Sequence, residues 1–181
     1  MPGRIDETVP FRPLRIAVLT ISDSRDEASD RSGALLVERL EKAGHILAAR
    51  AIVRDEIEEI VARLRAWSED PGIEVVLTTG GTGVTGRDVT PEALARIAEK
   101  HIPGFGELFR WLSYAKIGTS TIQSRADAAV ANGTYIFCLP GSPGACRDAW
   151  DEILQSQLDI RYRPCNFAEM MPRLREHESR G

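Results

Sequence analysis

Residues 73–93 read IEVVLTTGGTGVTGRDVTPEA, and this stretch decides the fold. Its first part, residues 73–79, is a short apolar run that is rich in β-branched residues and bounded by turn residues, which is typical of a buried strand. A glycine-rich loop follows at residues 80–88. Thr90-Pro91 then marks a helix start, with Thr as the N-cap and Pro as the first helical residue. A strand, a loop and a helix in this order predict one unit of a parallel α/β sheet.

The same alternation extends in both directions from this stretch. Further strands are predicted at residues 15–22, 46–53 and 134–139. Helices are predicted where Leu36, Leu40 and Ala43 recur before a closing Gly44, then at 57–67, 105–117 and 121–131, and after Pro143. Strands that alternate with helices of this length predict a three-layer α/β/α fold with a mostly parallel sheet. We expect an N-terminal arm at residues 1–13 and a single domain at 14–181.

Composition narrows the class of protein. The chain has 181 residues, of which 23 are basic and 27 acidic, so the net charge of −4 argues against nucleic acid as a partner. The three cysteines, Cys138, Cys146 and Cys165, are too far apart for a CxxC pair, which favours free thiols in a reducing compartment; Cys138 is expected to be a core residue. No apolar run is long enough to cross a bilayer, and no signal-peptide pattern is present. We therefore expect a cytoplasmic protein without a membrane partner.

The glycine-rich loop allows two interpretations. Residues 81–86 (GTGVTG) match the dinucleotide pattern GxGxxG, but the helix begins only at Pro91, and Ile-Pro-Gly stands where an acidic ribose ligand is needed. A Walker A loop is excluded because no Gly-Lys-Ser/Thr is present. What stays open is a backbone cradle for an anion or a plain turn. Four glycines within residues 80–86 favour the cradle, and we expect Gly81 and Gly83 to occupy positions that a side chain would obstruct.

Polar residues follow each predicted strand, and in parallel sheets such residues meet at one edge. Asp55 follows the second strand and is either a functional acid or an N-cap paired with Glu58. Asp88 ends the glycine loop and is either a functional acid or a turn residue. Two carboxylates beside an anion site suggest Mg²⁺. The candidate ligand contacts on this edge are Ser22 and Asp23, the loop residues Gly80, Gly81, Thr82 and Gly83, the cations Arg87 and Arg125, and the hydroxyls of Ser120 and Ser142.

Several ordered motifs resemble one known family. Residues 77–93 (LTTGGTGVTGRDVTPEA), 103–107 (PGFGE) and 139–143 (LPGSP) are similar to the signatures of the MoaB/MogA family of molybdenum cofactor biosynthesis proteins. The same module occurs as the G domain of gephyrin and of plant Cnx proteins. The resemblance extends from residue 15 to about residue 167. Residues 117–126 (IGTSTIQSRA) and 163–167 (RPCNF) point to the MoaB branch.

The resemblance implies a molybdopterin-binding fold and an activity. Active members of the family use Mg-ATP to adenylylate the terminal phosphate of molybdopterin, with release of pyrophosphate. The family's two key acids match Asp55 and Asp88, which the resemblance makes catalytic residues and Mg²⁺ ligands, with ATP and molybdopterin as substrates. The matching loop adds Pro140, Gly141 and Ser142 to the binding residues. Two alternatives stay open: a carrier that holds molybdopterin without chemistry, and an oligomeric scaffold.

Aromatic residues predict self-association. Residues 105–114 contain Phe105, Phe109, Trp111 and Tyr114. Because Phe109, Trp111 and Leu112 are spread around the helix axis, a second buried face and a partner are implied. The resemblance to the family makes this partner a copy of the same chain, in a trimer or in a hexamer of two trimers.

Overall fold

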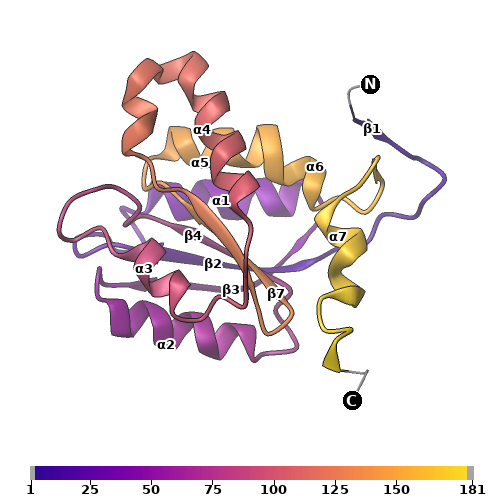
Figure 1. Cartoon of the computed structure of the whole chain (residues 1–181), viewed down its shortest axis with the longest axis horizontal. Coiled ribbons are helices and arrows are strands. Elements are labelled where there is room, and N and C mark those ends of the chain that lie inside the picture. Colours follow the sequence, from indigo (N-terminus) through magenta and orange to yellow (C-terminus); the bar gives the residue numbers. More distant parts are fainter. Residues whose placement is uncertain (1–2, 179–181) are drawn as a thin grey trace.

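A six-stranded sheet with the order β3-β2-β4-β7-β6-β5 forms the centre of the computed structural model, which describes residues 3–178 (Figure 1). The strands β2 (Arg15–Ile21), β3 (Ile46–Val53), β4 (Val75–Thr79) and β7 (Thr134–Leu139) are mutually parallel. The strand β6 (Asp127–Ala131) is antiparallel to β7 and to the short edge strand β5 (Lys100–His101). The sheet is therefore mostly parallel, as predicted.

Helices cover both faces of the sheet, which gives two separate cores. One core packs α1 (Arg31–Lys42), α4 (Pro103–Ile117) and α5 (Pro143–Ala149) against sheet residues that include Ile16 and Val18. The other packs α2 (Ile57–Ser68) and α3 (Thr90–Ala95) against residues that include Ala17 and Leu19. Successive residues of β2 thus point into opposite cores, as expected for a strand buried on both faces. The predicted three-layer α/β/α fold is confirmed (Figure 1).

The C-terminal part returns to the start of the chain. The helix that begins with α5 continues through a π-helical turn, η2 (Trp150–Leu154), into α6 (Gln155–Gln157). After it come β8 (Tyr162–Arg163), α7 (Phe167–Met170) and η3 (Met171–Arg173). β8 pairs antiparallel with β1 (Arg4–Ile5), which lies within the residues predicted as an arm. The ring of Phe167 packs on those of Tyr135 and Phe137, so α7 lies against the first core.

The helix predicted at residues 121–131 is wrong. These residues instead form the end of a 3₁₀ helix, η1 (Gly118–Gln123), and the strand β6. Alanine favours helices, but Ala128 and Ala129 are fully buried in the sheet between the two helical layers, and tertiary packing overrides propensity. Asn132 (φ 49°) and Gly133 (φ 78°) then form the tight turn of a hairpin to β7. Asn-Gly between two apolar runs is the signal that predicts such a hairpin.

The start of α3 also differs from the prediction. Its N-cap is Val89, and Thr90 is the first helical residue. The Thr90 hydroxyl instead donates a hydrogen bond to the carbonyl oxygen of Gly80 (2.8 Å). The threonine therefore ties the helix to the beginning of the glycine-rich loop.

Cys138 is a core residue, as predicted. It is fully buried in β7, and burial raises the pKa of its thiol to about 12. Among residues 3–178, no helix is long and apolar enough to span a membrane.

His45 links the start of β3 to the segment before β2. Its Nδ1 accepts a hydrogen bond from the Leu14 N–H (3.1 Å), and its ring lies between those of Phe11 and Trp150. Burial lowers the pKa of the imidazole, and the charges of Asp159 and Glu74 oppose this only in part. The folded protein therefore favours the neutral ring, whose Nδ1 is free to accept the bond.

This histidine should make folding sensitive to mild acid. The unfolded chain binds a proton near the ordinary histidine pKa of about 6.5, whereas the folded chain does so only at lower pH, so stability is lost as the pH falls below about 6.5. We expect urea denaturation to give a lower free energy of unfolding at about pH 5.5 than at about pH 7.5. His45→Gln should flatten this dependence. If the free energy of unfolding fell equally with pH in the variant and in the wild type, His45 would not be the group responsible.

Candidate functional site

The loops after the parallel strands meet at one edge of the sheet. The Gly80 N–H donates to the carbonyl oxygen of Leu139 (3.0 Å), and the Ser22 N–H donates to that of Val53 (2.9 Å). Gly80 has a φ of +105°, and a Cβ there would lie 2.2 Å from the carbonyl oxygen of Ile21. The chain therefore passes from β4 into the loop through a gap that only glycine fits.

Hydrogen bonds to its carbonyl oxygens fix the glycine-rich loop, residues 80–88. Arg125 supplies most of them: its backbone N–H binds the Thr82 carbonyl (2.8 Å), and its side chain binds those of Gly83 and Asp88 (2.7 Å each). The guanidinium also pairs with Glu92. Arg125, predicted as a cation for phosphate, is thus engaged in holding the loop. None of these contacts uses the N–H groups of the loop.

Two loop glycines occupy positions that a side chain would obstruct, as predicted. Gly81 has a φ of +66°, and a Cβ there would lie 2.3 Å from the Thr90 hydroxyl and 3.2 Å from Asp55 Oδ1. A Cβ on Gly83 would lie 2.7 Å from Asp88 Oδ2. Both predicted catalytic acids therefore lie close to the loop, with one carboxylate near each of these glycines.

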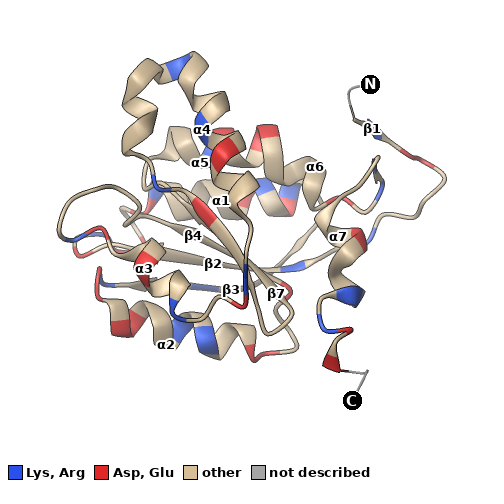
Figure 2. Cartoon of the chain, in the orientation of Figure 1, with Lys and Arg blue, Asp and Glu red and all other residues tan. Residues whose placement is uncertain are grey.

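Asp55 does not cap α2. The N-cap is Glu56, without a side-chain hydrogen bond, so of the two roles left open for Asp55 on the sequence the N-cap paired with Glu58 is wrong. The Asp55 carboxylate instead accepts a hydrogen bond from the Asp23 N–H (2.9 Å), and the Asp23 carboxylate accepts one from the Asp55 N–H (3.1 Å). Arg87 binds both oxygens of Asp23 (2.9 and 3.0 Å) and also reaches Glu56 (3.0 Å). Figure 2 shows this mixture of acidic and basic segments in the loops at the left edge of the sheet.

The two acids have opposite pKa shifts. Burial, followed by the charge of Asp23, raises the pKa of Asp55, and Asp88 adds to this effect. Burial also acts to raise the pKa of Asp88, but hydrogen bonds from the hydroxyl and N–H of Thr85 outweigh it, so the pKa of Asp88 is lowered. A half-buried carboxylate surrounded by other carboxylates, as at Asp55, is an environment that a divalent cation would relieve.

This donor set fits a magnesium ion that is shared with a substrate. Within residues 3–178, no three side chains of His, Cys, Asp or Glu come close enough to hold a metal by themselves. Mg²⁺ is usually held by one or two carboxylates together with water and substrate phosphates. Asp55 and Asp88 are the two carboxylates that would hold such an ion.

Three further predicted contacts, Ser22, Ser142 and Ser120, differ in what their hydroxyl groups do. The Ser22 hydroxyl accepts hydrogen bonds from the N–H groups of the Ser24 and Arg25 backbone (3.2 Å each), and Ser142 caps α5 through the Ala145 N–H (3.2 Å). Ser120 is exposed in η1. Its role as a ligand contact stays a prediction, as do those of the other residues named on the sequence.

A pocket of about 270 Å³ opens beside the Pro140–Ser142 turn, between α4, η1 and α5. Its floor includes Phe109, and the hydroxyl residues at its wall are Ser113, Thr121, Ser124 and Ser142. The first three were missed on the sequence because hydroxyl residues in or near a helix look like ordinary surface residues. Only the return of η1 onto α4, where Thr121 donates to the Arg110 carbonyl oxygen (3.2 Å), brings them together.

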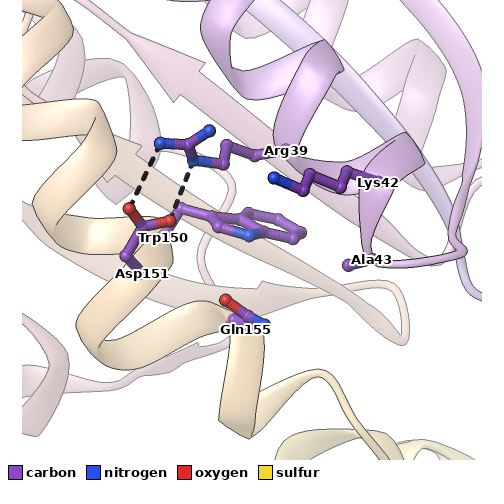
Figure 3. A pocket seen from close by; sticks show the side chains of 6 residues that line it. All are labelled: Arg39, Lys42, Ala43, Trp150, Asp151 and Gln155. Atoms are coloured by element: carbon purple, nitrogen blue, oxygen red, sulfur yellow. Dashed lines mark hydrogen bonds and ion pairs between the residues drawn. The ribbon is translucent and has the colours of Figure 1, made fainter.

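A second pocket, of about 380 Å³, lies between α1 and η2 (Figure 3). Its lining residues are Arg39, Lys42, Ala43, Trp150, Asp151 and Gln155. Arg39 reaches across it to both carboxylate oxygens of Asp151 (2.9 and 3.3 Å). No residue of the glycine-rich loop lines this pocket, so it is separate from the candidate site.

Comparison with known families defines the class. A family model described as "Probable molybdopterin binding domain" matches residues 17–160. This range contains the glycine-rich loop, both acids and the Pro140–Ser142 turn. The fold described above is thus that of the molybdopterin-binding α/β domain family.

Individual relatives narrow this class. The chain is 51% identical over 157 residues to molybdenum cofactor biosynthesis protein B of Escherichia coli K12, covering 87% of this chain and 92% of the relative. It is 43% identical over 146 residues to the protein of the same name from Bacillus subtilis 168, covering 80% and 86%. The chain belongs to the MoaB family of molybdenum cofactor biosynthesis proteins, which confirms the predicted resemblance.

Solved structures agree with this assignment. A crystal structure of a molybdenum cofactor biosynthesis protein B superposes with a TM-score of 0.82 at 39% identity, covering 91% of this chain and 98% of that one. A tungsten cofactor synthesizing protein MoaB from Pyrococcus furiosus gives a TM-score of 0.73 at 35% identity, covering 83% and 94%.

Proposed function

We propose that this protein transfers the adenylyl group of Mg-ATP to the terminal phosphate of molybdopterin and releases pyrophosphate. The observation that carries the proposal is that two carboxylates lie close to the loop glycines at the carboxyl edge of the sheet, Asp55 at Gly81 and Asp88 at Gly83. A carrier would need the loop but not two acids next to it.

The loop supplies the anion-binding part of the site. Its carbonyl oxygens are bound mainly by Arg125 and Thr90, and the N–H groups of Gly80, Thr85 and Asp88 bond within the protein. The N–H groups of Gly81 and Thr82 are the ones we assign to a ligand. Left-handed φ values at Gly80 and Gly81 give a conformation in which successive N–H groups can converge on a phosphate. Thr82, which is buried beside them, adds a hydroxyl.

The acids position the nucleotide. Asp55 and Asp88 would hold Mg²⁺, directly or through its waters. When bound, the metal offsets the negative charge on the ATP phosphates and on the leaving pyrophosphate. Because both reactants are anions, the barrier depends mainly on this charge compensation and on in-line positioning. Arg87 keeps Asp23 paired and so limits the repulsion on Asp55.

The pterin ring fits the pocket beside Pro140. This pocket is largely apolar and has several hydroxyl groups in its wall, which suits a flat heteroaromatic ring with polar edges. Ser142 lines the pocket and lies in the loop that follows β7, so the ring in the pocket and the phosphate at the glycine-rich loop can belong to one ligand.

A direct assay tests the proposal. Purified protein incubated with molybdopterin and Mg-ATP should give adenylylated molybdopterin and pyrophosphate in equal amounts. Tight molybdopterin binding without pyrophosphate release would instead establish the carrier.

We also propose that the protein is a homotrimer. Phe105 and Phe109 are buried in the first core, but Trp111 is 73% exposed and Ile122, on the adjacent η1, is 76% exposed. Tyr114 and Ile117 are also exposed on α4. A group of large apolar side chains in neighbouring elements is a feature of protein interfaces.

A charged side chain in place of Trp111 should prevent the three chains from associating. We expect the wild type to have the mass of three 20.0 kDa chains in light scattering at micromolar concentration, and Trp111→Glu to have the mass of one. Ile46→Glu, at an exposed apolar residue at the start of β3, serves as the control and should not change the mass. A monomeric wild type would refute the trimer.

A further inference from the structure

Hydrogen bonds to two of its carbonyl oxygens hold the turn that follows β7, residues 140–143. That of Pro140 accepts hydrogen bonds from the Thr79 hydroxyl (2.9 Å) and the Cys146 thiol (3.3 Å). That of Gly141 accepts from the Ser32 hydroxyl (2.7 Å) and from Arg25 Nη2 (2.8 Å). Ser32 and Arg25 are more than a hundred residues away in the sequence. The place of this turn therefore depends on the loop after β2 and on the start of α1.

A buried acid, Asp30, lies beside Arg25 at the start of α1. Asp30 is only 1% exposed, and it caps α1 by accepting from the Gly33 N–H (2.9 Å). It also accepts from the Thr20 hydroxyl (2.7 Å) and from Arg50 Nη2 (2.9 Å). Arg25 Nη1 lies 4.0 Å from its carboxylate.

Arg25 is held at a second point as well. The same Nη1 donates to the Ser32 hydroxyl (3.2 Å), so the two groups that bind the Gly141 carbonyl also bind each other. This is a connected polar network in which each donor to the turn has a fixed neighbour.

The turn touches both parts of the candidate site. A Cβ on Gly141 would lie 3.3 Å from Gly80 Cα, so the turn rests directly on the first glycine of the glycine-rich loop. Pro140 and Ser142 line the pocket beside α4. A displacement of Gly141 would consequently move the two parts of the site that the proposed function assigns to molybdopterin, the wall of the pocket and the glycine at the start of the phosphate-binding loop.

We propose that Arg25 and Ser32, oriented by Asp30, are positioning residues that set the turn at residues 140–143 for molybdopterin binding. This inference rests on the proposed function, because it assigns the turn to the molybdopterin side of the reaction. The two side chains contact the turn through the carbonyl oxygen of Gly141, and we assign them no contact with the substrate.

The kinetic test separates the two substrates. Arg25→Gln should raise KM for molybdopterin about tenfold, while KM for ATP and kcat stay within about twofold. Ser32→Ala should give the same pattern, and Arg25→Lys should restore part of the loss. Arg39→Gln is the matched control, because Arg39 lies on α1 but binds Asp151 and not the turn. A general loss of structure would lower kcat and raise both KM values together, which would overturn the proposal.

A second measurement needs no turnover. The Ala145 and Cys146 N–H groups bond to Ser142, so their hydrogen exchange reports on the turn in the free protein. Arg25→Gln and Ser32→Ala should speed exchange in residues 140–146 at least fivefold and leave residues 46–53 unchanged. Wild-type exchange there in both variants would overturn the positioning role.

The inference about the turn can be tested even if the protein has no adenylyl transfer activity. If the wild type releases no pyrophosphate but binds molybdopterin, the dissociation constant replaces KM, and the same tenfold weakening is expected in Arg25→Gln. Unchanged binding by both variants would then refute the inference about the turn and would leave the exchange result as a purely structural effect.

Discussion

Asp55→Asn and Asp88→Asn should each slow adenylyl transfer about a hundredfold and leave the fold intact. Loss of one metal carboxylate removes about 3 kcal/mol of transition-state stabilisation, because the charge on the nucleotide phosphates is then less well compensated. Molybdopterin binding should survive in both variants, since the loop and the pocket are unchanged.

The structure explains why folding should tolerate these changes. Asp55 is not a helix cap, and an amide oxygen can still accept the hydrogen bond from the Asp23 N–H. At Asp88 an amide oxygen can likewise accept from the N–H and hydroxyl of Thr85. In Asp55→Asn the amide also relieves the repulsion between residue 55 and Asp23, so the thermal stability of this variant at neutral pH should not fall.

Pyrophosphate release under saturating Mg-ATP measures the effect. Glu56→Gln is the control, because Glu56 is adjacent to Asp55 in sequence and carries the same charge, but it pairs with Arg87 and is not one of the two proposed metal ligands. It should keep nearly normal turnover. If both aspartate variants also turned over normally, the two acids would have no catalytic part and the carrier would be the better description.

Gly80→Ala should destabilise the protein by about 3 kcal/mol. The residue has a left-handed φ of +105°, and the added methyl group would lie 2.2 Å from a backbone carbonyl oxygen that cannot move without displacing β2. For a chain of this size, the melting temperature should fall by roughly 6–12 °C. The backbone displacement at residue 80 would occur at the edge where four strands end. Ligand binding should therefore be lost as well.

The same loop offers a matched control for this change. A Cβ added at Gly86 would meet nothing within 4 Å, and the residue has no left-handed φ, so Gly86→Ala should be nearly neutral. Scanning calorimetry of the two variants side by side measures the difference. Equal melting temperatures would show that the backbone around residue 80 can accommodate a methyl group with little loss of stability.

Local patterns in the sequence were sufficient for most of the fold. Continuous β-branched runs predicted the parallel strands, and a single apolar face predicted α2. The exception was the alanine-rich strand β6. Its small side chains have no strong strand preference, and their burial between two layers decides the structure. The Asn132-Gly133 pair carried the better signal, because it specifies a hairpin turn.

The site was predictable only in outline. Because parallel strands end at a common edge, Asp23, Asp55 and Asp88 could be grouped from the order of the strands and loops alone. Which groups bind one another could not be predicted, since that depends on side-chain packing across distant segments. Arg125 was expected to bind phosphate but holds the loop carbonyls, and the buried Asp30 was missed although an Asp three residues before Gly33 matches a helix cap.

The pairing of β1 with β8 has a practical consequence. In Figure 1, β1 and α7 lie together on the right, and the loops that carry the two acids lie on the left. A fluorophore, an affinity handle or a surface tether joined before β1 or after α7 would therefore sit across the molecule from the ligand edge. Protein immobilised through either end would present that edge to solution, which suits surface-based binding measurements.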